Sequence, residues 1–217
     1  MLHGSASPGV AGSELTRLLA RLADGPPTEG RPAFGERLGH WLGWAGAISL
    51  ASALAAGQAV PAAGRTAGSE DADFRRVRAA LEAAIAAGPA EPATSPDDFG
   101  PFHRHCLGLQ QGMHDAVAAL RRRLREALSR RSAALARVAA IDAALEPALA
   151  AQERRVLALV PQRLMAHFER LGREHGEDAG WLAAFREDLD EVMRAELAHR
   201  LLPVQGLLQT LHDHDAR

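Results

Sequence analysis

The apolar positions between Phe102 and Leu171 recur at steps of three and four residues, which is the spacing of a helix buried along one side. On the first arm this stripe consists of Phe102, Cys106, Leu109, Met113, Val117, Leu120, Leu124 and Leu128. Ser132 is placed to cap a second arm, which carries Leu135, Val138, Ile141, Leu145 and Leu149. The pattern predicts a long antiparallel helical pair. It also predicts a kink or break near Pro147 and Pro161, since each proline removes an amide donor.

Shorter apolar stripes flank this pair on both sides. Ser13 is placed to cap a short helix, whose apolar face is Leu15, Leu18, Leu19 and Leu22. Pro32 can sit in the first turn of the next helix, and a further helical piece covers residues 48–56. A last helix starts near Asp178 and is predicted to be interrupted at Pro203, before a final amphipathic segment.

The predicted fold class is all-α, a helical bundle built around the long pair with shorter N-terminal helices and two linkers rich in proline and glycine. Apolar residues make up 47% of the 217 positions and aromatic residues only 4%, a composition that favours helix over strand. The predicted order is N-terminal helices (1–56), a linker (57–68), a helix (69–87), a Pro-rich loop (88–100), the main helical core (101–211) and a polar tail (212–217).

Charge and composition exclude several classes of protein. A formal net charge of −2 gives no overall attraction to nucleic acid or to an anionic membrane. The chain has no lysine, which disfavours P-loop and Schiff-base chemistry. Cys106 is the single cysteine, so no intrachain disulfide is possible. The first residues lack a signal-peptide pattern, and the uncharged stretch between Arg37 and Arg65 is built mainly from Ala, Gly and Ser, with few large side chains. We therefore expect a cytoplasmic protein without a membrane span.

Two kinds of histidine-containing pattern suggest metal or hydrolase sites. His103, His105 and Cys106 are zinc-ligand types, but His105 points away from the other two on a helix, and the second pair of ligands is missing. The His-Asp dipeptides at 114–115, 212–213 and 214–215 lack the further ligands that a phosphohydrolase needs. We expect a buried, inert Cys106, solvated His-Asp pairs, and no catalytic residue, metal or cofactor.

Arginines are concentrated on and after the first arm. With Leu120, Leu124 and Leu128 facing inward, Arg121, Arg122 and Arg125 are predicted on the exposed side, where they can contact phosphates or an acidic protein surface, or merely be solvated. Asp142 lies close to the apolar stripe of the second arm. A carboxylate there needs a partner, so we expect Arg137 or an arginine of another helix to meet it.

Several stretches together resemble an uncharacterised proteobacterial family of about this length. They are LTRLLARLAD, FGERLGHWLGWAGAISLASAL, FHRHCLGLQQGMHDAVAALRRRLREAL, LARVAAIDAAL, HFERL and AELAHRLLPVQGLLQTL. Members of that family lie beside genes for a proton-driven motor pair similar to the flagellar stator, in the third type of the Zorya anti-phage defence system. The resemblance implies an accessory component of such a system. It supplies no catalytic residues.

The leading prediction is a non-enzymatic interaction module that docks on the motor's cytoplasmic part or on a partner accessory protein of the same defence system. The candidate docking faces lie in residues 34–54 and 197–211, and their apolar members are Phe34, Leu38, Trp41, Trp44, Leu54, Leu207, Leu208 and Leu211. The alternative is a nucleic-acid-binding effector that uses Arg121, Arg122 and Arg125, and a hydrolase ranks last. A homodimer is expected as readily as a monomer, because arms of this length can pair along their sides.

Overall fold

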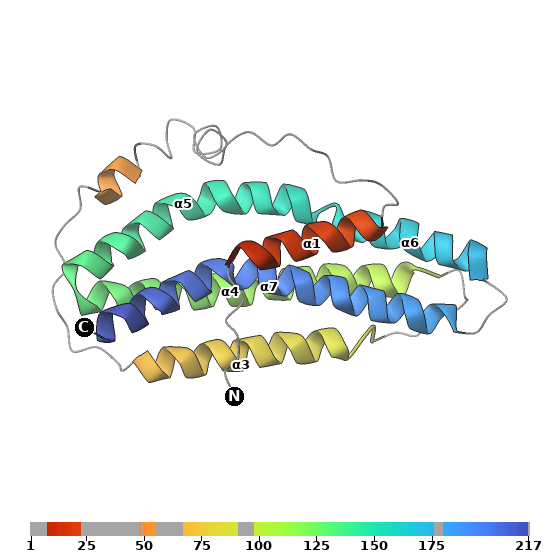
Figure 1. Cartoon of the computed structure of the whole chain (residues 1–217), viewed down its shortest axis with the longest axis horizontal. Helices are drawn as coiled ribbons and strands as arrows, with labels where there is room; N and C mark the ends of the chain where they lie inside the picture. Colours follow the sequence, from red (N-terminus) through yellow and green to blue (C-terminus); the bar gives the residue numbers. More distant parts are fainter. Residues whose placement is uncertain are drawn as a thin grey trace. The chain divides into compact units, whose positions relative to one another are not determined.

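A computed structural model describes residues 8–22, 48, 50–54, 67–90, 98–175 and 180–216. The helices are α1 (Pro8–Leu22), α3 (Ala67–Ala86), α4 (Gly100–Arg131), α5 (Ala133–Leu157), α6 (Val160–His175) and α7 (Trp181–Asp215) (Figure 1). The described residues contain no β-strand, and residues 50–54 add a short helical segment. The predicted all-α class is confirmed.

The stripe that predicted the first arm is the buried side of α4. Its eight members, from Phe102 to Leu128, are all between 0% and 9% exposed. The helix begins inside the segment predicted as a loop, because Asp98 caps it. The Asp98 carboxylate Oδ1 accepts a hydrogen bond of 3.0 Å from the Gly100 amide. Helix α4 therefore extends the predicted arm by two residues at the start, to Gly100, and by two residues at the end, to Arg131.

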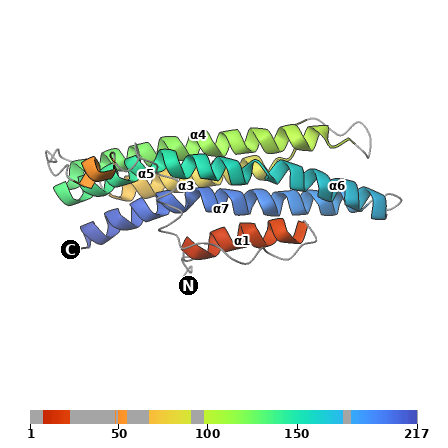
Figure 2. The same ribbon diagram turned by 90° about the horizontal axis from the view of Figure 1, so that it is seen from above.

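Ser132 separates α4 from α5 and caps the second helix, as predicted. Its hydroxyl accepts a bond from the Leu135 amide at 3.2 Å, and its carbonyl accepts the first helical bond from Ala136. The two helices then run side by side in opposite directions (Figures 1 and 2). Pro147 lies inside α5 without ending it, so a break at this position is wrong. Near Pro161 the break occurs, as turn residues 158 and 159 between α5 and α6.

The chain forms two compact units. Unit 1 contains residues 1–28, 77–116 and 157–202, and unit 2 contains residues 29–76, 117–156 and 203–217. The core of unit 1 includes a cluster of rings from α4, α6, α7 and Phe99, whose members are Phe99, Phe102, Phe168, Trp181 and Phe185. Ring centroids of Phe168 and Phe185 are 5.0 Å apart in an edge-to-face arrangement. Such pairs add about 0.5–1.5 kcal/mol each beyond their burial.

In unit 2, exposed polar bonds join helix ends that are distant in sequence. His212 Nε2 lies 2.8 Å from Asp71 Oδ2, and Arg131 Nη1 lies 2.7 Å from Asp215 Oδ1. Helix α7 continues to Asp215. Residues 212–215 are therefore exposed and polar, as predicted, but they belong to the last turn of α7 and do not form a separate tail.

Two further expectations about helix ends are wrong. Helix α7 runs through Pro203 without interruption. The missing amide costs up to ~3 kcal/mol, and the burial of Leu201 and Val204 on either side offsets that cost. Helix α1 begins at Pro8, so Ser13 lies inside the helix and not at its cap. Helix α3 starts two residues before Ser69 and ends before Gly88, whose φ of 67° is typical of a helix C-terminal glycine.

Candidate interaction site

Two arginines of α4 and two carboxylates of α5 form an ion-pair network in unit 2. Arg121 binds Asp142 with both Nε and Nη2, at 2.8 and 2.6 Å. Arg125 Nη1 reaches Asp142 at 3.2 Å and Glu146 Oε2 at 2.7 Å. The expectation that an arginine of another helix meets Asp142 is confirmed. The network fixes the antiparallel register of the two helices, because four formal charges neutralise one another only in this alignment.

The predicted exposure of Arg121 is wrong. Only 8% of this residue is exposed, and Arg125 is partly buried. Each side chain is turned toward the α5 carboxylates and is therefore poorly placed to receive a phosphate or an acidic partner. The prediction failed because Arg121 borders the apolar stripe of α4 on the side that α5 covers. A single helix pattern cannot tell which border of a stripe a neighbouring helix covers.

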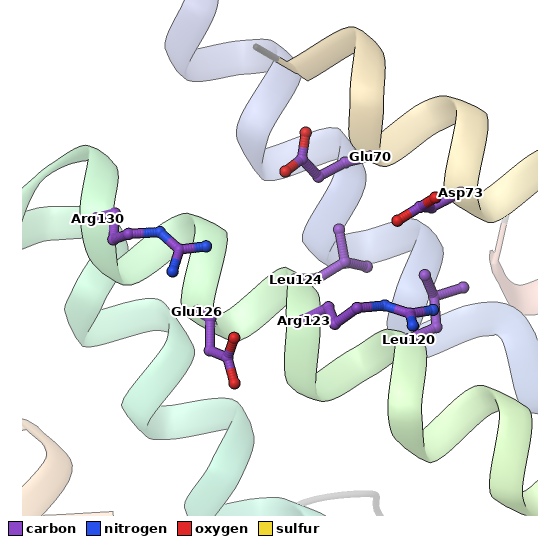
Figure 3. A pocket seen from close by; sticks show the side chains of 7 residues that line it. All are labelled: Glu70, Asp73, Leu120, Arg123, Leu124, Glu126 and Arg130. Atoms are coloured by element: carbon purple, nitrogen blue, oxygen red, sulfur yellow. The ribbon is translucent and has the colours of Figure 1, made fainter. Parts of the chain in front are cut away.

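The arginines of α4 that remain available are Arg122, Arg123 and Arg130. All three are exposed and form no ion pair with another described residue. Arg123 and Arg130 line a pocket of about 110 Å³ in unit 2. Figure 3 shows Glu70 and Asp73 extending from α3 on the opposite side, with the side chains of Leu120 and Leu124 between the two helices.

The pocket combines both signs of charge on an apolar floor. Glu70, Asp73 and Glu126 supply three carboxylates against the two guanidinium groups. Glu70 is only 9% exposed and accepts a bond of 2.7 Å from the Ser69 hydroxyl. This balance of charge repels a polyanion about as much as it attracts one. The arrangement is suited to polar contacts with a protein surface, and it contains no paired acid and base aimed at a common point.

A second polar network lies inside unit 1 at the break between α5 and α6. Pro161 has no amide hydrogen, so the Leu157 carbonyl four residues earlier loses its helical donor. Gln110 of α4 replaces it, with Nε2 at 3.1 Å from the Leu157 oxygen. The same Nε2 donates to Glu196 Oε2 at 2.9 Å, and Arg200 donates to Glu196 Oε1 at 2.8 and 2.9 Å.

Sequence reasoning missed this second network. Glu196 is fully buried and Arg200 is 7% exposed, although both are residue types that normally lie at the surface. Two signals were available. Glu196 and Arg200 are four residues apart on the buried side of their helix, and Pro161 follows Leu157 at the distance that frees a carbonyl. The network ties α4, α7 and the end of α5 together, and its charges neutralise one another without reaching solvent.

The histidine and cysteine positions do not assemble into a reactive centre in the part of the chain that the structure describes. Cys106 is fully buried, its Sγ lies 3.6 Å from Met193 Sδ, and burial together with the nearby Glu196 charge raises the pKa of the thiol to about 12. Burial lowers the pKa of His105, and a hydrogen bond to the backbone of Ile85 opposes this effect. Among the described residues, no three His, Cys, Asp or Glu side chains are arranged to hold a metal ion.

The predicted apolar docking faces divide into three cases. Leu207, Leu208 and Leu211 are 4%, 5% and 1% exposed, so the C-terminal docking face is wrong, because these leucines belong to the packed side of α7. Leu54 is 54% exposed and remains available. The other predicted members, Phe34, Leu38, Trp41 and Trp44, lie outside the described residues.

The fold and these networks define an all-α protein in which the buried Arg121, Glu196 and Arg200 form ion pairs within the bundle. The chain belongs to the family described as Protein of unknown function (DUF3348), which matches residues 1–213. No curated protein and no solved structure matches the chain. Among the helices that the structure describes, none is both long enough and apolar enough to cross a bilayer.

Proposed function

We propose that this chain is a non-enzymatic interaction component, an accessory protein of an anti-phage defence system of the Zorya kind. It docks on the cytoplasmic part of a stator-like motor or on a partner accessory protein. The observation that carries the proposal is the exposure of large aliphatic side chains on a short helix. Ile48 and Leu54 are 52% and 54% exposed, whereas the buried Arg121, Glu196 and Arg200 already form ion pairs within the chain.

The short helical segment around residues 50–54 supports docking for a physical reason. Ala51, Ser52 and Leu54 are exposed and Ala53 is buried, so the segment offers most of its surface to a partner. Covering one leucine side chain contributes about 1.5–3 kcal/mol. An exposed pair of aliphatic residues is therefore enough to anchor a weak helical contact, which neighbouring polar contacts then strengthen.

The test is pairwise co-purification of the full chain with the cytoplasmic part of the motor and with the partner accessory protein. We expect a complex with one of them, and we expect Leu54→Arg to weaken it by roughly 10- to 100-fold. Ala51→Arg is the matched control, since it places the same charge on an exposed position nearby that offers a partner little apolar area. A chain that elutes alone from every mixture refutes the proposal. Light scattering of the chain alone distinguishes a monomer from a homodimer.

The alternative function is nucleic-acid binding, which Arg122, Arg123 and Arg130 favour because they are exposed and form no ion pair with another described residue, although the carboxylates beside Arg123 and Arg130 oppose it. Arg121 and Arg125 no longer support it, because both bind carboxylates of α5. If the alternative is right, DNA or RNA binding weakens steeply with salt. The triple substitution to Gln then lowers the slope of log K against log salt by about 2–3. Absence of binding to single- and double-stranded DNA and to RNA at low salt excludes it.

A further inference from the structure

Helix α1 is held on unit 1 by a small and well-defined set of contacts. Leu15, Leu18 and Leu22 are 4%, 7% and 5% exposed and recur at steps of three and four on one side. Arg21, one turn after Leu18, donates to Glu191 Oε2 at 2.6 Å and to Asp188 Oδ1 at 3.3 Å. Figures 1 and 2 show α1 lying along α7, with its C-terminal end beside α6. The hydrogen bond to Glu191 raises the pKa of Arg21, consistent with a true ion pair.

The surface of α6 and α7 that α1 covers is called its seat, and the acidic residue Asp188 of this seat is held in place independently of α1. Asp188 Oδ2 lies 2.7 Å from Nε2 of His167, a residue of α6 that is 5% exposed. His167 Nδ1 lies 2.9 Å from Arg170 Nη2. A guanidinium can only donate, so Nδ1 accepts and the Nε2 hydrogen points at Asp188. Asp188 therefore keeps a donor when α1 is absent, and it remains oriented to receive a cation.

The hold of α1 on the seat depends on noncovalent contacts. Residues 29–76, which separate it from the next segment of unit 1, belong to the other unit. A helix of this length is marginal by itself in water, so α1 gains its helical structure from the surface that it covers. A segment of this kind competes with any other helix that carries the same pattern.

We propose that the surface between α6 and α7 is a docking groove for an amphipathic helix, and that α1 is its intramolecular plug. The partner that fits is a helix with leucine at positions i, i+3 and i+7 and a basic residue at i+6, the arrangement of Leu15, Leu18, Arg21 and Leu22. A partner helix with this pattern displaces α1. The inference does not depend on the proposed function, because the plug and its seat lie within one unit of this chain.

The test uses a fluorescent peptide with the sequence of residues 8–22 and the full chain, with binding followed by fluorescence anisotropy. A tethered plug has an effective concentration on the order of a millimolar, so the wild-type chain binds the peptide weakly. In the full chain with Leu18→Asp, the plug leaves the groove. We expect this chain to bind the peptide roughly 10- to 100-fold more tightly than wild type.

Two controls test whether the peptide binds the groove through its leucines and its arginine. A peptide with Leu18→Asp is expected to bind neither chain, because its leucines make the apolar contacts with the groove. A peptide with Arg21→Glu loses affinity for the Leu18→Asp chain, and adding Glu191→Arg to that chain restores part of it, because the pair is then reversed. Equal binding of the wild-type peptide to both chains places the peptide elsewhere and overturns the proposal.

A second variant whose α1 leaves the groove, called an opened chain, covers the case in which the Leu18→Asp chain fails to fold. Arg21→Glu changes an exposed side chain and places a third carboxylate beside Asp188 and Glu191, which weakens the seat of α1 without altering its leucines. Far-ultraviolet circular dichroism and a cooperative melt establish that the variant is folded. If a folded, opened chain fails to bind the wild-type peptide, the groove is not a docking site.

Discussion

Replacing Gln110 with leucine tests whether the break between α5 and α6 is stabilised by a side chain from α4. The substitution removes one amide that serves two acceptors, the Leu157 carbonyl and the buried Glu196 carboxylate. Leaving a buried polar group without its partner costs about 1–3 kcal/mol. Arg200 still binds Glu196, and the new leucine recovers some apolar contact. We therefore expect a total loss of about 2–3 kcal/mol in the free energy of unfolding.

The assay is chemical and thermal unfolding followed by circular dichroism. For a chain of this size the expected loss lowers Tm by roughly 5–10 °C. The matched control is Gln111→Leu. Gln111 is the same residue type one position later, but it is exposed, and its partner among the described residues is Asp115 on its own helix. Its replacement is expected to change stability by less than about 0.5 kcal/mol.

A double-mutant cycle with Pro161→Ala isolates the carbonyl contribution. Alanine at 161 restores an amide four residues after Leu157, so the carbonyl regains a helical donor. In the Pro161→Ala background, Gln110→Leu is then expected to cost about 1 kcal/mol less than in wild type. If Gln110→Leu costs no more than Gln111→Leu in the wild-type background, the reasoning about the freed carbonyl is refuted.

Three further predictions follow from the same geometry. Arg121→Met is expected to lower the free energy of unfolding by about 2–3 kcal/mol, because it removes the bidentate partner of Asp142 in a largely buried site. The control Arg122→Met, at an exposed position, is expected to lower it by less than about 0.5 kcal/mol. Equal losses of the two variants in urea unfolding contradict a stabilising role of the ion-pair network. The Cys106 thiol is expected to resist a disulfide reagent at mildly alkaline pH, because it is buried and its pKa is raised. It should then be labelled only as fast as the chain unfolds. Fast labelling of the native chain contradicts its burial. Burial lowers the pKa of His105 in the folded chain, so the unfolded chain binds more protons below pH 6.5. The stability that His105 contributes is therefore complete above that pH and is lost as the pH falls. His105→Gln is expected to flatten this pH dependence of stability in urea titrations.

The sequence alone determined the helical class and the inward side of α4, whereas only Leu135 of the stripe predicted for the second arm is buried. The stripe from Phe102 to Leu128 is buried throughout, and the Ser132 cap is found where it was predicted. These features are local, because helix periodicity and capping depend on residues within a few positions of one another. Proline was less reliable. Pro161 accompanies a break, but α5 and α7 continue through Pro147 and Pro203. At Pro203 the burial of Leu201 and Val204 outweighs one missing amide.

The tertiary structure alone decided which polar residues are buried and with whom they pair. Arg121 and Arg122 are adjacent in sequence, yet the first binds Asp142 and the second is exposed, because α5 covers only one border of the α4 stripe. The bonds of Gln110 likewise join helices distant in the chain. Such pairings depend on how helices are aligned and rotated against one another, and the pattern of a single helix carries no information about either.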